Sequence, residues 1–403
     1  MASTPTTESD RTIARGHLLA LDGIRGLAIL MVIGSHAFES NYGAHGRLTD
    51  FIGRLLYYGY FGVDLFFVLS GFLITGILFD SLQDKGYFRK FYARRALRIF
   101  PLYYGVLVVC LLLTHPLHLH WGDMGWLLMF YLQNLHPMKI MNFSPGAGIG
   151  LYHFWSLAVE EQFYLVWPAA VFLIRDKRKL LITMLVASGA ALLLRLGLLE
   201  YGASPFAMHV TTVCRADSLL LGGALAMLYR SRQWARVQRV APWGFVCAAT
   251  IIVASIFMLQ PLMARWSIYP ALWSSGVEYT VLALGFGCLI AWSLRPGSIC
   301  QWIFQMGWMR FLGKYSYGLY VLHVLVLSAM NLPLRAALLG ATHNKMVAVV
   351  GAGMTSLAVS IVAAYASYHL YEKPFLNLKH RFDYSRRTLN HGSPDDAFTL
   401  QSK

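Results

Sequence analysis

Apolar stretches recur along the whole chain, and they constrain its fold more than any other feature. Ten of them have 17 or more residues, which is enough for an α-helix to cross the hydrocarbon core of a bilayer. The charged fraction is only 13%, against roughly 25% in soluble domains. We therefore expect an all-α fold, a polytopic integral membrane helical bundle with about ten transmembrane helices. The approximate limits of the ten stretches are 24–40, 57–79, 97–114, 154–174, 180–200, 213–229, 243–260, 272–293, 311–332 and 346–370.

An eleventh apolar stretch, 121–135, is too short for a span. Its 15 residues make about 22 Å of helix, against roughly 30 Å of hydrocarbon. It is rich in tryptophan and tyrosine, which favour the membrane interface. We expect a short re-entrant or interfacial helix here, within an outer loop over 115–153.

The basic residues lie between the apolar stretches, as membrane topology requires. With ten spans and a cytoplasmic N-terminus, the inner segments hold 25 of the 34 Lys and Arg, the outer loops hold six and the spans hold three. If 121–135 also crossed, the basic run 175–179 would move outside and the bias would collapse. The net charge of +15 therefore indicates a lipid bilayer as partner and no nucleic acid. Both termini are predicted to be cytoplasmic.

Three regions are expected along the chain. Residues 1–17 form a polar cytoplasmic tail with no apolar core, so we expect no cleavable signal peptide. Residues 18–378 form the transmembrane domain. Residues 379–403 are polar and are expected to be a loose cytoplasmic tail.

Arg25 and His36 are ionisable residues inside the first apolar stretch, eleven residues apart. At about 100° per residue they share nearly the same helix face, about 16 Å apart along the axis. Ionisable groups at membrane depth are costly, so a function is the first hypothesis for both. The topology places Arg25 toward the cytoplasm and His36 toward the outside.

Further polar residues fall in the outer half of the predicted bundle. A carboxylate that accepts the Nδ1 proton of His36 would leave Nε2 free to act as a base toward a hydroxyl group. Adjacent Glu160 and Glu161 differ by about 100° on a helix, so only one is expected to face His36. Ion pairs between helices are the alternative for all these groups. The candidates are His36, Asp64, Glu160 and Glu161 for catalysis, and Arg215 and Asp217 for substrate binding.

A second group of basic residues lies at the predicted inner surface, in the sequence RRALRIFP. Arg95 and Arg98 are i, i+3 neighbours, and Arg94 pairs with Arg98 at i, i+4. Guanidinium groups fit phosphates well, so Arg25, Arg94, Arg95 and Arg98 are candidates for binding an anionic cofactor. The alternative is an anchor on anionic lipid.

Seven motifs in order give the chain a resemblance to the acyltransferase 3 family of membrane proteins. The resemblance extends from about Leu18 to Phe375, and no single motif would be specific. The motifs are LDGIRGLAILMVIGSHAF, GVDLFFVLSGFLIT, RRALRIFP, FWSLAVEEQFYLVWP, RADSLLLGG, LGKYSYGLYVLH and YEKPF.

The resemblance implies transfer of an acyl group, often acetyl, from a cytoplasmic acyl-CoA such as acetyl-CoA to a sugar hydroxyl on an envelope glycan or lipid carrier. It also implies a bacterial inner membrane. It assigns His36 as the catalytic imidazole, Arg25 as its functional partner, Arg95 and Arg98 to the acyl-CoA phosphates, and Glu160, with Glu161 second, as the carboxylate. Some members carry a C-terminal SGNH hydrolase-type domain, which we do not expect here.

Other residues carry weaker signals. Neither the five scattered cysteines nor the histidines of the outer loop have a metal-ligand spacing, so no metal is expected. His323 is expected to be a hydrogen-bonded core residue rather than a catalyst, and Ser70 to serve helix packing with Gly71 and Gly76. Two rivals to an enzyme stay open: a transporter or exporter of a lipid-linked or acylated glycan without chemistry, and a membrane sensor or scaffold.

Overall fold

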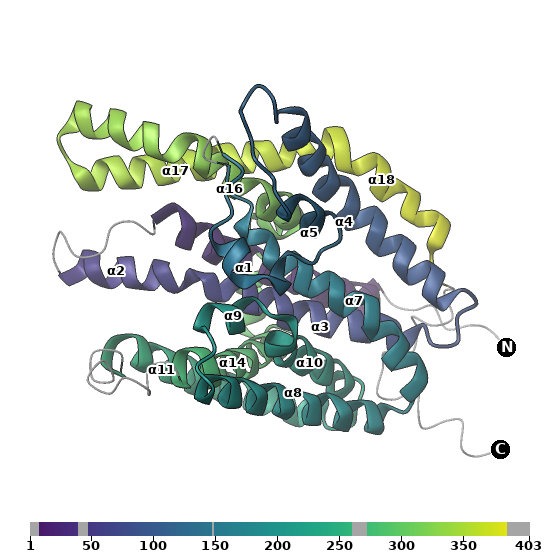
Figure 1. The fold of residues 1–403 in the computed structure, drawn as a ribbon. Coiled ribbons are helices and arrows are strands. Elements are labelled where there is room, and N and C mark those ends of the chain that lie inside the picture. The colour runs from purple at the N-terminus through teal and green to yellow at the C-terminus, as the bar shows by residue number, and fades with distance from the viewer. Residues whose placement is uncertain (1–7, 39–46, 147–148, 260–271, 385–403) are drawn as a thin grey trace, which may run out of the picture.

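Long helices lie side by side in one bundle, and the residues that the structure describes contain no strand (Figure 1). The computed structural model describes residues 8–38, 47–146, 149–259 and 272–384. The longer helices are α1 (Glu8–Phe38), α2 (Arg47–Tyr57), α3 (Gly62–Asp80), α4 (Tyr87–Leu112), α7 (Trp155–Ile174), α8 (Lys177–Glu200), α10 (Thr212–Tyr229), α11 (Trp234–Ala254), α14 (Glu278–Ser293), α16 (Gly307–Thr342) and α17 (Lys345–Ser367). The short helical segments are η1 (Tyr58–Phe61), α5 (Met124–Met129), η2 (Gln133–Leu135), α6 (Pro137–Met141), η3 (Tyr152–Phe154), α9 (Pro205–Val210), η4 (Ser255–Leu259), η5 (Leu272–Val277), α15 (Ile299–Phe304), η6 (Tyr368–Glu372), α18 (Lys373–Asn377) and η7 (Leu378–Phe382).

Nine helices in the described ranges are long and apolar enough to cross a membrane, and they match nine of the ten predicted spans. The chain is therefore an integral membrane protein with a polytopic helical bundle, as predicted. The tenth predicted span is α10, which has 18 residues and carries two charged residues near its start.

Helix α10 lies inside the bundle, packed against α3, α8 and α14. Its close contact with α3 depends on residues without side chains. A Cβ atom at Gly71 would meet the backbone of Leu219, and one at Gly222 would meet the backbone of Val68. Small residues allow helix backbones in a membrane to approach this closely, and this confirms the packing role predicted for Gly71.

The stretch 121–135 does not form the single short helix that was predicted. It contains α5, then a break at Tyr131, where φ is +56°, and then η2. The ring of Tyr131 stacks on Tyr103 of α4 with centroids 4.2 Å apart. The buried Gln133 side chain donates to the Phe154 carbonyl over 2.8 Å. These contacts with the bundle stabilise two short helical segments in place of one helix. As predicted, the stretch is too short to span the membrane.

The chain ends also differ from prediction. Helix α1 already begins at Glu8, so the described part of the N-terminal tail is helical. Segment η7 packs against α4, so residues 379–384 are docked rather than loose. Residues 1–7 and 385–403, the rest of the two predicted tails, lie outside the described residues. Between the first two predicted spans, the described residues form helix α2, which leads through η1 into α3.

Candidate active site

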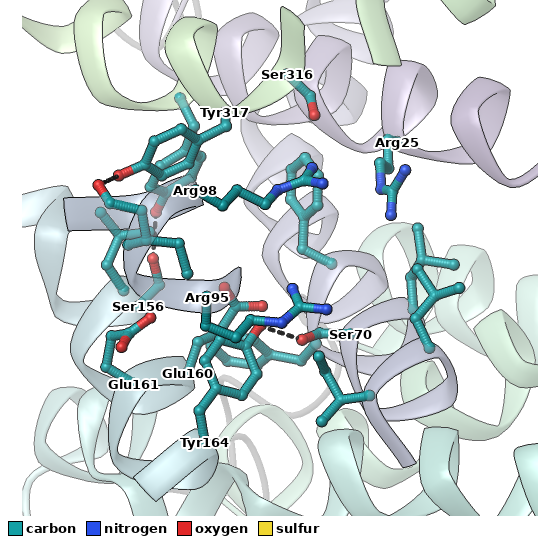
Figure 2. A pocket seen from close by; sticks show the side chains of 18 of the residues that line it. Arg25, Ser70, Arg95, Arg98, Ser156, Glu160, Glu161, Tyr164, Ser316 and Tyr317 are labelled. Atoms are coloured by element: carbon teal, nitrogen blue, oxygen red, sulfur yellow. Dashed lines mark hydrogen bonds between the residues drawn. The ribbon is translucent and has the colours of Figure 1, made fainter. Parts of the chain in front are cut away.

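A cavity of about 110 Å³ lies between α1, α3, α4, α7 and α16 (Figure 2). Apolar side chains of α3 form much of its wall. Polar groups enter from every other helix around it. The polar lining residues are Arg25, Ser70, Arg95, Arg98, Ser156, Glu160, Glu161, Tyr164, Ser316, Tyr317 and Tyr320.

Three guanidinium groups converge on this cavity. Arg25 comes from α1, while Arg95 and Arg98 come from one face of α4, as their i, i+3 spacing predicts (Figure 2). Arg25 pairs with Asp22 one turn earlier on α1, at 2.5 Å. The guanidinium carbon of Arg95 lies 5.6 Å from the centre of the Tyr164 ring. Three cations around a small space form a site for a negatively charged group.

Two carboxylates face the same cavity from α7. Glu160 lies beside Ser70 and Tyr164, and it shares the cavity with Arg95 and Arg98. The hydroxyls of Ser70 and Tyr164 are 2.5 Å apart. The Oε1 atom of Glu161 is buried without a hydrogen-bond partner among the described residues. A buried carboxylate with unused hydrogen-bonding capacity favours a donor in the cavity.

A second, larger cavity of about 550 Å³ adjoins the first. The two cavities share Arg25, Arg98 and Tyr317, so these residues form the boundary between them. Five cationic side chains and two carboxylates line the larger cavity, which gives it a net positive charge. They are Arg25, Arg98, Arg310, Lys314 and Lys379, with Asp22 and Glu372.

His36 lies outside both cavities. The prediction that Glu160 or Glu161 orients its ring is wrong. Its Nδ1 atom is 3.0 Å from Nε2 of His323, and no carboxylate contacts its ring among the described residues. Glu160 is the sixth residue of α7, about 7.5 Å along the helix from Trp155, and it lies beside Arg95 of α4. This depth matches Arg95 rather than His36. The cavity nevertheless ends near the histidines, because Tyr320 lines it and lies one turn before His323 on α16.

The structure does not bring Asp64, Arg215 or Asp217 to either cavity. All three side chains are fully buried, and Arg215 forms an ion pair with Asp64. Asp217 accepts from Arg195 over 2.7 Å, and from Thr280. The predictions of a catalytic Asp64 and of substrate binding by Arg215 and Asp217 are therefore not supported. A buried charge must be paired, and these residues pair with one another across α3, α8 and α10.

Arg94 also differs from its predicted role in binding a cofactor. It forms an ion pair with Asp383 and donates to the carbonyls of Lys379 and Phe382, each over 3.4 Å. Its position on α4 is 100° from Arg95, so it faces the C-terminal segment rather than the cavities.

Several site residues were missed from the sequence. Ser70, for which a packing role was predicted, lines the cavity, and its hydroxyl pairs with that of Tyr164. On α16, Lys314, Tyr317, Tyr320 and His323 follow at intervals of three, so each side chain lies only about 60° around the helix from the next. This spacing was the available signal. No cluster of three or more His, Cys, Asp or Glu in the described ranges is arranged to hold a metal.

The fold and the cavities define a membrane protein with a buried, positively charged site, and comparison with known proteins adds its family. A family model described as an acyltransferase domain matches residues 18–365. The chain belongs to the acyltransferase 3 family, as its motifs predicted. No solved structure matches it significantly.

Its relatives include proteins named for acetyl transfer. A putative peptidoglycan O-acetyltransferase of Bacillus subtilis (strain 168) is 29% identical, covering 93% of this chain and 57% of the relative. A peptidoglycan O-acetyltransferase of Listeria monocytogenes is 33% identical, covering 77% and 49%. A putative O-acetyltransferase of Staphylococcus aureus (strain COL) is 28% identical, covering 78% and 51%. The chain spans about half the length of these relatives.

Proposed function

We propose that this protein is a membrane-bound O-acyltransferase. It transfers an acyl group, with acetyl as the expected group, from acyl-CoA to a hydroxyl of a carbohydrate acceptor at the cell envelope. The observation that carries the proposal is the pair of adjoining cavities, cationic at their shared boundary, that leads toward the His36 and His323 pair. Membership of the acyltransferase family supports the reaction type.

The larger cavity fits the anionic part of the donor. Arg310, Lys314 and Lys379 line it together with the shared Arg25 and Arg98. Guanidinium and ammonium groups bind phosphates through charge-assisted hydrogen bonds. An acyl-CoA held there by its phosphates would pass its thioester end between Arg25, Arg98 and Tyr317 into the smaller cavity. The positive-inside distribution of Lys and Arg supports a cytoplasmic position for this end and for both termini.

His36 supplies the base in this proposal. Its Nε2 atom removes the proton from the acceptor hydroxyl as the oxygen attacks the thioester carbonyl carbon. The carbon–sulfur bond breaks, and the thiolate takes the proton back from His36 to leave CoA as the free thiol. In a second route, His36 itself takes the acyl group and then passes it to the acceptor. Trapping of an acyl-histidine in a rapid quench supports the second route, and its absence during normal turnover supports the first.

The acceptor is proposed from the relatives. Two of them are named for peptidoglycan, so the first acceptors to test are peptidoglycan fragments and lipid-linked sugars. His36 is partly exposed and lies about 16 Å along α1 from Arg25, toward the end of the bundle away from the cationic cavity. A donor and an acceptor that approach from opposite ends would meet there. The proposed setting is a bacterial inner membrane.

One assay tests the function. Purified protein in lipid nanodiscs is given acetyl-CoA labelled in the acetyl group together with a glycan acceptor, and wild type is compared with His36→Ala. We expect acceptor labelling and CoA release by wild type, and a loss of at least about 100-fold in the variant, the scale of general base catalysis. Equal labelling by the variant would refute the role of His36. Transport of an unmodified glycan without CoA release would favour the exporter.

A further inference from the structure

The two rings of the histidine pair come from helices that are far apart in sequence. His36 lies on α1, His323 lies on α16, and Nδ1 of the first is 3.0 Å from Nε2 of the second. Only one of two facing ring nitrogens can donate in a hydrogen bond between neutral imidazoles. The direction of this bond therefore decides which nitrogen of His36 is free.

Backbone carbonyls settle the direction. Nδ1 of His323 lies 2.8 Å from the carbonyl oxygen of Tyr320 and 3.0 Å from that of Leu319. A carbonyl oxygen only accepts, so Nδ1 of His323 must carry the proton. In the neutral ring, Nε2 of His323 is then an acceptor. It accepts the proton on Nδ1 of His36, and Nε2 of His36 is left with its lone pair.

The free nitrogen of His36 is open to a ligand. No hydrogen bond occupies its Nε2 within the described part of the chain, and the side chain is partly exposed. His323 is fully buried, which favours its neutral form. The other rings that contact the pair are Tyr152, with its centroid 5.7 Å from that of His36, His153, 5.2 Å from His323, and Tyr320, 5.7 Å from His323. None of them supplies a carboxylate to orient His36.

We propose that His323 is a positioning residue for His36. A chain of hydrogen bonds runs from the Tyr320 carbonyl through the imidazole of His323 and ends at the imidazole of His36. The chain fixes His36 in the tautomer with the proton on Nδ1 and aims Nε2 as the base. A neutral imidazole thus does the orienting work that a carboxylate does in a serine–histidine–aspartate site. This inference rests on the proposed function, because it assigns a partner to the proposed base.

The chain also accounts for the proton during turnover. Nε2 of His36 gains the acceptor's proton, while Nδ1 keeps its own proton and its bond to His323. No anion contacts the pair to stabilise the resulting imidazolium, so the proton on Nε2 passes readily to the thiolate that leaves. Nε2 and Nδ1 of His36 then return to their starting states. The protons on Nδ1 of His36 and on Nδ1 of His323 stay in place throughout.

Two amide substitutions of His323 distinguish its proposed role in orienting His36 from a role in helix packing. In His323→Gln the amide group takes the place of Nε2, so its oxygen can accept from His36. In His323→Asn the amide takes the place of Nδ1, so it can donate to the Tyr320 carbonyl but cannot reach His36. Both variants are polar and similar in size. We measure kcat and KM for acetyl-CoA in nanodiscs, after checking each variant by gel filtration and thermal melting.

We expect the Gln variant to keep kcat within about tenfold of wild type and the Asn variant to lose about 100-fold or more, with KM unchanged in both. Equal kcat in the two folded variants, or a change in KM alone, overturns the proposal. If the Asn variant does not fold, the Gln variant decides alone, and a folded Gln variant with a loss beyond tenfold also overturns it. Activity that survives His36→Ala refutes the proposed function instead, which keeps the two failures distinct.

Discussion

Gly313 on α16 lies directly against the backbone of Asp22 on α1. A Cβ atom at Gly313 would meet the Asp22 carbonyl, and one at Gly26 would meet the carbonyl of Met309. The two helices therefore approach at glycines close to Arg25 and meet again at His36 and His323. This crossing determines both the boundary of the cavities and the histidine pair.

Gly313→Ala should destabilise the protein by about 1–3 kcal/mol, because the added methyl group forces the two backbones apart. Gly340→Ala on the same helix is the matched control, since nothing lies within 4 Å of its Cβ position. There, loss of glycine flexibility should stabilise by about 0.4–1 kcal/mol. Thermal melting in detergent measures both. A Gly313→Ala protein that melts at or above the wild-type temperature would contradict this account of the crossing.

Asp217→Leu should destabilise the protein strongly, by roughly 3–5 kcal/mol, because it leaves the buried Arg195 without its counter-charge. The double variant Arg195→Met with Asp217→Leu should recover much of the loss, since no unpaired charge remains. Asp123→Ala is the control, because its pair with Lys139 is exposed and its loss should leave the melting temperature nearly unchanged. A double variant no more stable than Asp217→Leu alone would show that the network does more than neutralise charge.

Arg98→Ala should raise KM for acetyl-CoA by about tenfold or more, because Arg98 lines both cavities and loses a charge-assisted contact worth roughly 1.5–3 kcal/mol. The rate should return at high acetyl-CoA. Arg94→Ala, one helical turn away, removes the same charge from a side chain that faces Asp383 and should leave KM close to wild type. Steady-state kinetics gives the KM for acetyl-CoA of both variants and tests this difference. Equal effects of the two substitutions would indicate a general loss of positive potential rather than a site.

The C-terminal segment should undock as the pH falls. A hydrogen bond from Arg94 holds the pKa of Asp383 below its ordinary value, and His380 lies 3.6 Å from the same carboxylate. The contribution of the pair is fully present above the ordinary pKa of about 3.9 and is lost as pH falls through the lower folded value. Asp383→Asn mimics this loss at neutral pH.

The Asp383→Asn variant should therefore be cut faster by trypsin after Lys379 and Arg381 than the wild-type protein. The hydrogen bonds from Arg94 to two carbonyls of the segment remain, so the effect should be a few-fold. Asp123→Asn, which breaks an ion pair at another surface, serves as the control. Unchanged cleavage in Asp383→Asn would mean that the carbonyl contacts alone dock the segment.

The sequence by itself determined the class of fold, the order of the spans and several of the buried charged residues. These are local properties, because a bilayer accepts only long apolar helices and penalises each ionisable group wherever it occurs. It also grouped Arg25, Arg95 and Arg98 at one predicted surface from helix periodicity, and these three side chains line one cavity in the structure.

Only the tertiary structure decided which polar group meets which. His36 pairs with His323 rather than Glu160, and Asp64 pairs with Arg215 rather than a substrate. Each partner lies on a helix far along the chain, and a rotation of one helix by 100° would bring a different residue to the contact. That rotation depends on where backbones can approach, as at Gly313 and Gly222, and this is a property of two packed surfaces rather than of either segment alone.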